Sequence, residues 1–117
     1  MKLSDLIEKI QAKVLTVRPS YDAEVEGIYA GDRISDLLTQ GAAGILLVTN
    51  LAGVQVLRVV ELMDVPALCL LNGIVPEPEV IRAGEEHGAV LLVSPFDMFE
   101  TCGRLYERFS IAGKMRQ

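Results

Sequence analysis

The chain has 117 residues, half of them apolar, and its 11 basic and 16 acidic side chains give a net charge of −5. This length fits one domain, over residues 1–117, with a single core. The acidic balance and the lack of any Lys/Arg run exclude a nucleic-acid partner. No apolar run approaches the roughly 18 residues that cross a bilayer, which excludes a membrane partner.

The amino terminus and the cysteines indicate a cytoplasmic protein. The opening residues turn acidic and amphipathic where a secretory signal would need an apolar stretch. Cys69 lies in an apolar run and Cys102 at a helical core position, and neither has CxxC or metal-ligand spacing. We therefore expect two reduced, buried thiols, no metal and no cofactor.

The first half of the chain is predicted to be irregular, because its apolar segments are short and broken by polar loops. The Asp5-x-x-Glu8 pattern is typical of a capped helix start. The predicted elements that follow are a strand over 13–16, a loop over 18–22, a strand over 25–30 and a helix over 31–40 that ends at Gly41.

The second half is more regular and predicts three strand-then-helix units. They cover 44–49 then 51–63, 67–71 then 77–87, and 89–93 then 96–109. Each strand is a continuous apolar run, which is typical of strands covered on both faces. The sequence therefore predicts an α/β fold with three layers, in which helices cover both faces of a mainly parallel sheet.

Several residues mark the ends of the predicted helices. Ser94, followed by Pro95 and Asp97, is predicted to cap the last helix. His87 precedes Gly88 at a helix C-terminus, where an imidazole favours the negative end of the dipole, so we interpret this single histidine as a cap and not as a base.

The helix predicted over 51–63 has a single polar stripe, formed by Gln55, Arg58 and Glu61. The sheet covers only one side of such a helix. A second subunit is the simplest cover for its other apolar flank, which predicts a homodimer, and the alternative is cover by the N-terminal helix of the same chain.

Polar residues follow the predicted strands at their carboxyl ends, which in a parallel sheet lie at one edge, where ligands bind. Arg33 could bind an anion there with two parallel hydrogen bonds, and helix N-termini add partial positive charge. The candidate ligand-binding residues are Gly31, Asp32, Arg33, Asn50, Asn72, Gly73, Ser94 and Asp97. Equally, Asn50 and Ser94 could act only as helix caps, and Asn72-Gly73 only as a turn that needs positive φ.

Motifs of known enzyme classes are missing from the sequence. It has no GxxxxGK[ST], GxGxxG, GxSxG or HExxH string. The polar residues of the edge include no base, nucleophile or metal set, so we predict a chain that is not an enzyme and has no catalytic residues. An acyl- or phosphoryl-transfer fragment using Asp32, Arg33 and Asp97 is the weakest alternative.

Four segments taken together resemble the DRTGG domain family, named after an Asp-Arg-Thr-Gly-Gly string. They are Gly31-Asp32-Arg33, the strand over 44–48, the stretch over 70–80 with Asn72-Gly73, and the stretch over 91–101 with Ser94-Pro95. Here Ile34-Ser35 replaces the Thr-Gly-Gly of the family name. The opening residues 1–7 and the segment 27–38 are most similar to the stand-alone members encoded near iron hydrogenases, so the resemblance spans nearly the whole chain.

This resemblance implies a fold akin to the N-terminal domain of HPr kinase/phosphatase and a non-catalytic role, since the family also forms the regulatory region of long phosphotransacetylases and occurs beside CBS domains. We therefore expect a homodimeric regulatory or sensor domain that binds a small anionic ligand, such as a nucleotide, at the carboxyl edge. The alternative is a docking module for a redox or kinase partner, with no small ligand.

Overall fold

The structure, a computed structural model, describes residues 1–53, 55–62 and 64–114. The elements follow one another as α1 (Leu3–Lys9), β1 (Lys13–Val14), β2 (Gly27–Ala30), α2 (Ile34–Gln40), β3 (Ile45–Val48), α3 (Val56–Leu62), β4 (Leu68–Leu70), α4 (Pro78–His87), β5 (Leu91–Val93) and α5 (Met98–Lys114). This order contains the three predicted strand-then-helix units of the second half.

The five strands form one sheet in the order β1-β5-β4-β3-β2. The strands β2, β3, β4 and β5 are parallel to their neighbours, and β1 pairs antiparallel with β5. The prediction that the strands of the three units are mutually parallel is confirmed. The sheet is mainly parallel because a crossover helix separates each of these strands from the next.

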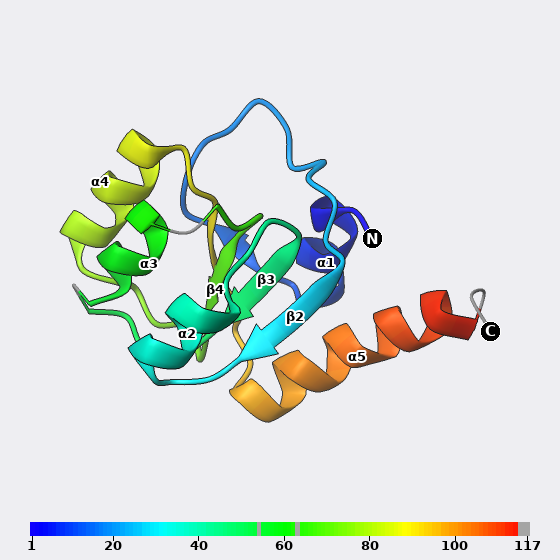
Figure 1. Cartoon of the computed structure of the whole chain (residues 1–117). Coiled ribbons are helices and arrows are strands. Elements are labelled where there is room, and N and C mark those ends of the chain that lie inside the picture. Colours follow the sequence, from blue (N-terminus) through cyan, green and yellow to red (C-terminus); the bar gives the residue numbers. More distant parts are fainter. Residues whose placement is uncertain (54, 63, 115–117) are drawn as a thin grey trace.

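Helices cover both faces of the sheet, with α2, α3 and α4 on one side and α1 and α5 on the other (Figure 1). Successive residues of a strand point to opposite faces. Leu47 accordingly packs in the cluster that includes the buried side chains of α2, α3 and α4, whereas Leu46 and Val48 pack in the cluster of α1 and α5. The predicted three-layer architecture is confirmed.

The helix predicted over 51–63 begins later, at Val56. The residues just before this helix are not helical, because the Leu51 N–H donates to Thr49 Oγ1 at 3.2 Å. Val56 and Val59 are fully buried, and α2 and α4 flank α3 on the same face of the sheet. The flanks of α3 therefore need neither a second subunit nor the N-terminal helix to cover them, since the neighbouring helices α2 and α4 do so. The side chains of Val54, Leu57, Val60 and Met63, which entered that prediction, lie outside the described residues.

Two predicted helix starts are wrong. The helix α1 begins at Leu3, because the Leu3 N–H bonds to the Ala23 carbonyl and Lys2 takes the N-cap position without a side-chain cap bond. The helix α5 begins at Met98, and Asp97 caps it by accepting the Glu100 N–H at 2.9 Å. The predicted end of α4 is confirmed, since Gly88 follows His87 with a φ of 73°.

The two cysteines differ in environment. Cys69 on β4 is fully buried, and this burial raises the pKa of its thiol to about 12. Cys102 on α5 is only half-buried, contrary to the prediction, because it lines a groove between α5 and β2. Both thiols are free.

Candidate functional site at the carboxyl edge

The parallel strands bring the predicted site residues to one edge of the sheet. Gly31 directly follows β2, Asn50 lies two residues after β3, Asn72 lies two residues after β4, and Ser94 directly follows β5. Because β2 to β5 are parallel, all of these positions lie at their common carboxyl edge.

Asp32 is the centre of a hydrogen-bond network there. Its Oδ1 accepts the Asn50 backbone N–H at 2.7 Å and the Thr49 hydroxyl at 3.2 Å. Its Oδ2 accepts the Asn50 side-chain amide at 3.0 Å. The Asn72 amide in turn donates to Asn50 Oδ1 at 3.1 Å. One set of bonds therefore joins the loops that follow β2, β3 and β4.

These donors hold Asp32 in its ionised form. The backbone N–H of Asn50 is the main cause that lowers the pKa of the Asp32 carboxyl, followed by the Asn50 side chain; burial acts in the opposite direction, and the Thr49 hydroxyl lowers it further. The carboxylate is thus matched by donors of its own chain.

The Asn72-Gly73 turn has the positive φ that the sequence predicts, with 60° at Asn72 and 63° at Gly73. The Asn72 N–H bonds to the Phe96 carbonyl and the Gly73 N–H to the Ser94 carbonyl, both at 2.9 Å. These bonds tie the loop after β4 to the loop after β5. The turn thereby extends the network across four neighbouring strands.

Ser94 and Asp97 stabilise the start of α5. Ser94 is fully buried, and its hydroxyl lies 2.8 Å from the Thr101 hydroxyl and accepts the Phe96 N–H at 3.2 Å. The predicted N-cap role of Ser94 therefore belongs to Asp97. Asn50 is not a helix cap either, since α3 begins six residues after it and Asn50 bonds to Asp32 instead.

Arg33 lies beside the network and points outward. It occupies the N-cap position of α2, with a side chain that is 79% exposed, and its Nε lies 3.7 Å from Asp36 Oδ2. Such an exposed pair is weak. The guanidinium therefore remains able to contact a ligand, although the acidic side chains of Asp32, Asp36 and Asp97 share this edge.

The predicted ligand-binding residues leave out Thr49, although the sequence places it beside Asn50 at the same edge; it is fully buried and its hydroxyl donates to Asp32. It lies directly after an apolar strand, so its position gave a usable signal: a polar residue that continues a buried run needs a partner.

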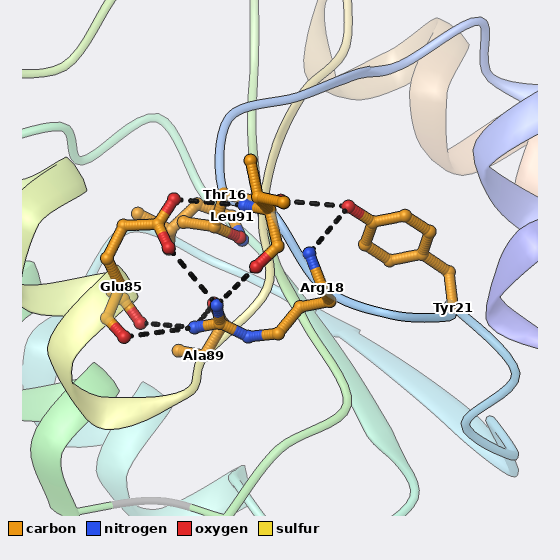
Figure 2. A network of polar contacts seen from close by, with 8 residues as sticks. Thr16, Arg18, Tyr21, Glu85, Ala89 and Leu91 are labelled. Atoms are coloured by element: carbon orange, nitrogen blue, oxygen red, sulfur yellow. Dashed lines mark hydrogen bonds and ion pairs between the residues drawn. The ribbon is translucent and has the colours of Figure 1, made fainter.

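Sequence reasoning also missed a second network, at the opposite, amino edge of the sheet (Figure 2). Arg18 donates to the Gly84 carbonyl at 2.7 Å and to the Ala89 carbonyl at 3.0 Å, and its Nη1 lies 3.2 Å from Glu85 Oε2. Glu85 also accepts the Val17 N–H at 2.9 Å. The segment predicted as an ordinary loop is thus bonded to the C-terminus of α4.

Tyr21 and Thr16 complete this second network. The Tyr21 hydroxyl donates to the Thr16 carbonyl at 2.9 Å and accepts the Arg18 N–H at 3.2 Å. The Thr16 hydroxyl accepts the Leu91 N–H at 3.1 Å, at the start of β5. A hollow of about 430 Å³ lies beside Arg18, between this loop and the segments that precede β3 and β4.

Two further observations bear on the class of site. Within the described ranges, no three His, Cys, Asp or Glu side chains gather as metal ligands would. In the same part of the chain, no helix is long and apolar enough to cross a membrane.

Comparison with known proteins finds a likeness in fold. Neither protein-family models nor curated protein sequences match the chain. The fold is similar to a crystal structure of the CBS and DRTGG domains of the regulatory region of Clostridium perfringens pyrophosphatase, in complex with its activator diadenosine tetraphosphate. The TM-score is 0.67 at 14% sequence identity, and the match covers 86% of this chain and 44% of that one. This chain thus has an α/β fold similar to one in a regulatory region, and it spans less than half of that structure.

Proposed function

We propose that the chain is a non-catalytic regulatory domain of the DRTGG family that senses a small anionic ligand at its carboxyl edge and acts as a homodimer. The observation that carries the proposal is the network of Asp32, Asn50 and Asn72, which couples the loops after β2, β3 and β4. A ligand that contacts one of these loops changes the bonds of the others. The similarity to the fold of a regulatory region supports this role.

The proposed ligand contacts are the exposed members of the edge. Arg33 supplies charge and a bidentate donor geometry, while Asn50 and Asn72 supply exposed amide groups. The backbone of Gly31 and Gly73 lies beside them. Asp32 aligns Asn50, and Ser94 and Asp97 support the site by fixing the start of α5. An anion suits this set, because the negative charge of Asp32 is already matched by donors.

The placement of His87 supports the non-catalytic part of the proposal. This single histidine ends α4, next to Gly88, and so lies at the amino edge, away from the candidate site. Its nearest charged partner is Glu61, at 4.0 Å. Asp32, the carboxylate at the centre of the carboxyl-edge network, has a lowered pKa, which makes it a poor base.

Calorimetric titration tests the ligand. Adenine nucleotides, acetyl phosphate and inorganic phosphate are titrated into the wild type, Arg33→Ala and the control Arg108→Ala, whose side chain lies near α1. We expect Arg33→Ala to weaken binding by about 1.5–3 kcal/mol, the range for a charged hydrogen bond, and Arg108→Ala to bind as the wild type does. Equal affinities in all three proteins would remove Arg33 from the site.

A docking module is the second candidate function. It is favoured by the loop between β4 and α4, where Ile74 is 41% and Val75 79% exposed at the same edge. Exposed apolar side chains that adjoin polar groups are typical of protein-binding surfaces. If none of the anions binds to the wild type, the docking function replaces the sensor function.

A further inference from the structure

The two outer strands of the sheet differ in how they are protected. The strand β1 has two residues and carries the exposed Lys13, and short edges with lysine discourage pairing with other strands. The strand β2 has four uncharged residues, all half-buried. It therefore lacks both kinds of protection.

The backbone of β2 has groups that point away from the sheet. The Gly27 N–H donates to the Gly44 carbonyl at 3.2 Å and the Gly31 N–H to the Val48 carbonyl at 3.0 Å, so these alternate positions face β3. Ile28 and Ala30 occupy the other alternate positions of the strand. Their N–H and C=O groups therefore point to the open edge, where another strand can pair.

An apolar flank of α5 lies next to this edge. A groove of about 360 Å³ separates Ile28 and Ala30 from Cys102, Tyr106 and Phe109. Tyr106 is 73% exposed, and Phe99, two turns before it on the outer side of α5, is 88% exposed and lines a second hollow with Lys9 and Arg104. Between them, apart from the backbone of the helix itself, no atom lies within 4 Å of the place where a side chain of Gly103 would begin. Two aromatic side chains thus stand on either side of a notch in the helix.

We propose that this surface, formed by the edge of β2 and the flank of α5 with Phe99 and Tyr106, binds a second copy of the same chain. A two-fold axis at Tyr29 pairs Ile28 of each copy with Ala30 of the other, antiparallel, so that one operation satisfies all outward groups of both strands. The same axis brings the two α5 flanks together, because Tyr106 lies alongside β2.

The size of the surface fits a stable dimer. A standard interface buries roughly 800 Å² on each partner. Aromatic side chains bury about 150–250 Å² each, so Phe99 and Tyr106 supply about half of this area. The strand edge and the sides of the groove supply the rest. An edge-to-edge pair also closes on itself, since no unprotected strand remains outside it.

This inference rests on the homodimer in the proposed function but not on its ligand. It also replaces the surface that the sequence suggested, because α2 and α4 flank α3. A monomeric wild type would overturn both the homodimer and its surface. A dimer that is insensitive to changes at Tyr106 would overturn the surface alone.

Light scattering and sedimentation, from micromolar to millimolar concentration, test the assembly in the wild type, Tyr106→Glu and a matched control. The control is Leu62→Glu, which changes another exposed apolar residue, 67% exposed, on the opposite face of the sheet. We expect a wild-type dimer, at least about a tenfold weaker one in Tyr106→Glu, and no change in Leu62→Glu. Equal dissociation constants in the wild type and Tyr106→Glu, or a weaker dimer in Leu62→Glu alone, would contradict the proposal.

Hydrogen exchange on the wild type gives a readout that needs no variant. The amides of Ile28 and Ala30 are expected to become protected as concentration rises through the dimer range, while the amide of Gly31, bonded to Val48, is protected throughout. If Ile28 and Ala30 exchange fast at every concentration, the strand edge takes no second copy. In that case a strand of another protein is its remaining partner.

Discussion

The two ends of the sheet each hold a charged side chain in a network, but in different ways. At the carboxyl edge, the donors to Asp32 include the side chains of Asn50 and Thr49, and Asn50 is itself exposed. At the amino edge, Arg18 donates to the main-chain carbonyls of Gly84 and Ala89, and its side chain is only 17% exposed.

The two networks should differ in how easily their bonds can be rearranged. The carbonyls that bind Arg18 belong to the C-terminus of α4 and the start of the β5 segment, so those bonds break only if that part of the fold opens. Two of the three donors to Asp32 are side chains, those of Thr49 and Asn50, which can rearrange one by one, and the third is the main-chain N–H of Asn50. We therefore expect the amino edge to be the more rigid end and the carboxyl edge to be the end that responds to the proposed ligand.

Removal of the Arg18 guanidinium should have the largest effect. Arg18→Leu removes the bonds of the guanidinium to the Gly84 and Ala89 carbonyls and to Glu85, which is expected to lower the free energy of unfolding by about 3 kcal/mol. The Gly84 carbonyl keeps the Ala89 N–H and Glu85 keeps the Val17 N–H, so the loss comes from the buried guanidinium contacts alone. Urea denaturation measures this loss. Arg108→Leu, which removes a long and more exposed pair with Asp5 at 4.0 Å, is the control and should cost less than about 1 kcal/mol. Equal losses would show that the amino edge is no more rigid than an ordinary surface.

Loss of the Asp32 charge should have a smaller effect. Asp32→Asn replaces a carboxylate oxygen by a donor that faces the donors of Asn50, and we expect a loss of about 1 kcal/mol because the site is open to solvent. The same urea experiment measures it. A loss as large as that of Arg18→Leu would mean that both edges carry similar stability.

The stability difference between the wild type and Asp32→Asn should depend on pH. The pKa of Asp32 is lower in the folded chain than its ordinary value of 3.8. Its contribution is therefore complete above the unfolded pKa and is lost as pH falls through the folded pKa. The stability gap between the wild type and Asp32→Asn should narrow when urea denaturation is repeated from neutral pH down to about pH 3. A gap that stays constant over this range would show that Asp32 acts through its shape and not its charge.

Removal of Arg33 should have the smallest effect on stability. Its contact with Asp36 is long and exposed, so Arg33→Ala is expected to change the free energy of unfolding by less than about 0.5 kcal/mol. Thermal and urea unfolding check this. A larger loss would assign Arg33 to the framework of the carboxyl edge and count against its proposed role as a ligand contact.

The second half of the fold was predictable because its signals are local. Apolar runs place β3, β4 and β5, and the positive φ of Asn72 and Gly73 follows from their residue types. Helix starts were less predictable. Asn50 and Ser94 resemble N-caps in sequence, but the structure bonds one to Asp32 and the other to Thr101. A side chain that can cap a helix can equally bond to a distant partner, and the sequence does not show which.

The α/β class, the parallel core and the gathering of polar loops at one edge follow from the sequence alone, because each depends on periodicity or on the direction of parallel strands. The pairing of the charged side chains with their partners follows only from the folded structure. Arg18 meets the Gly84 carbonyl across 66 residues, and Asp32 meets Asn50 across 18. Such pairs form because the folded sheet brings remote segments together, and no local pattern specifies which carbonyl or amide lies within reach.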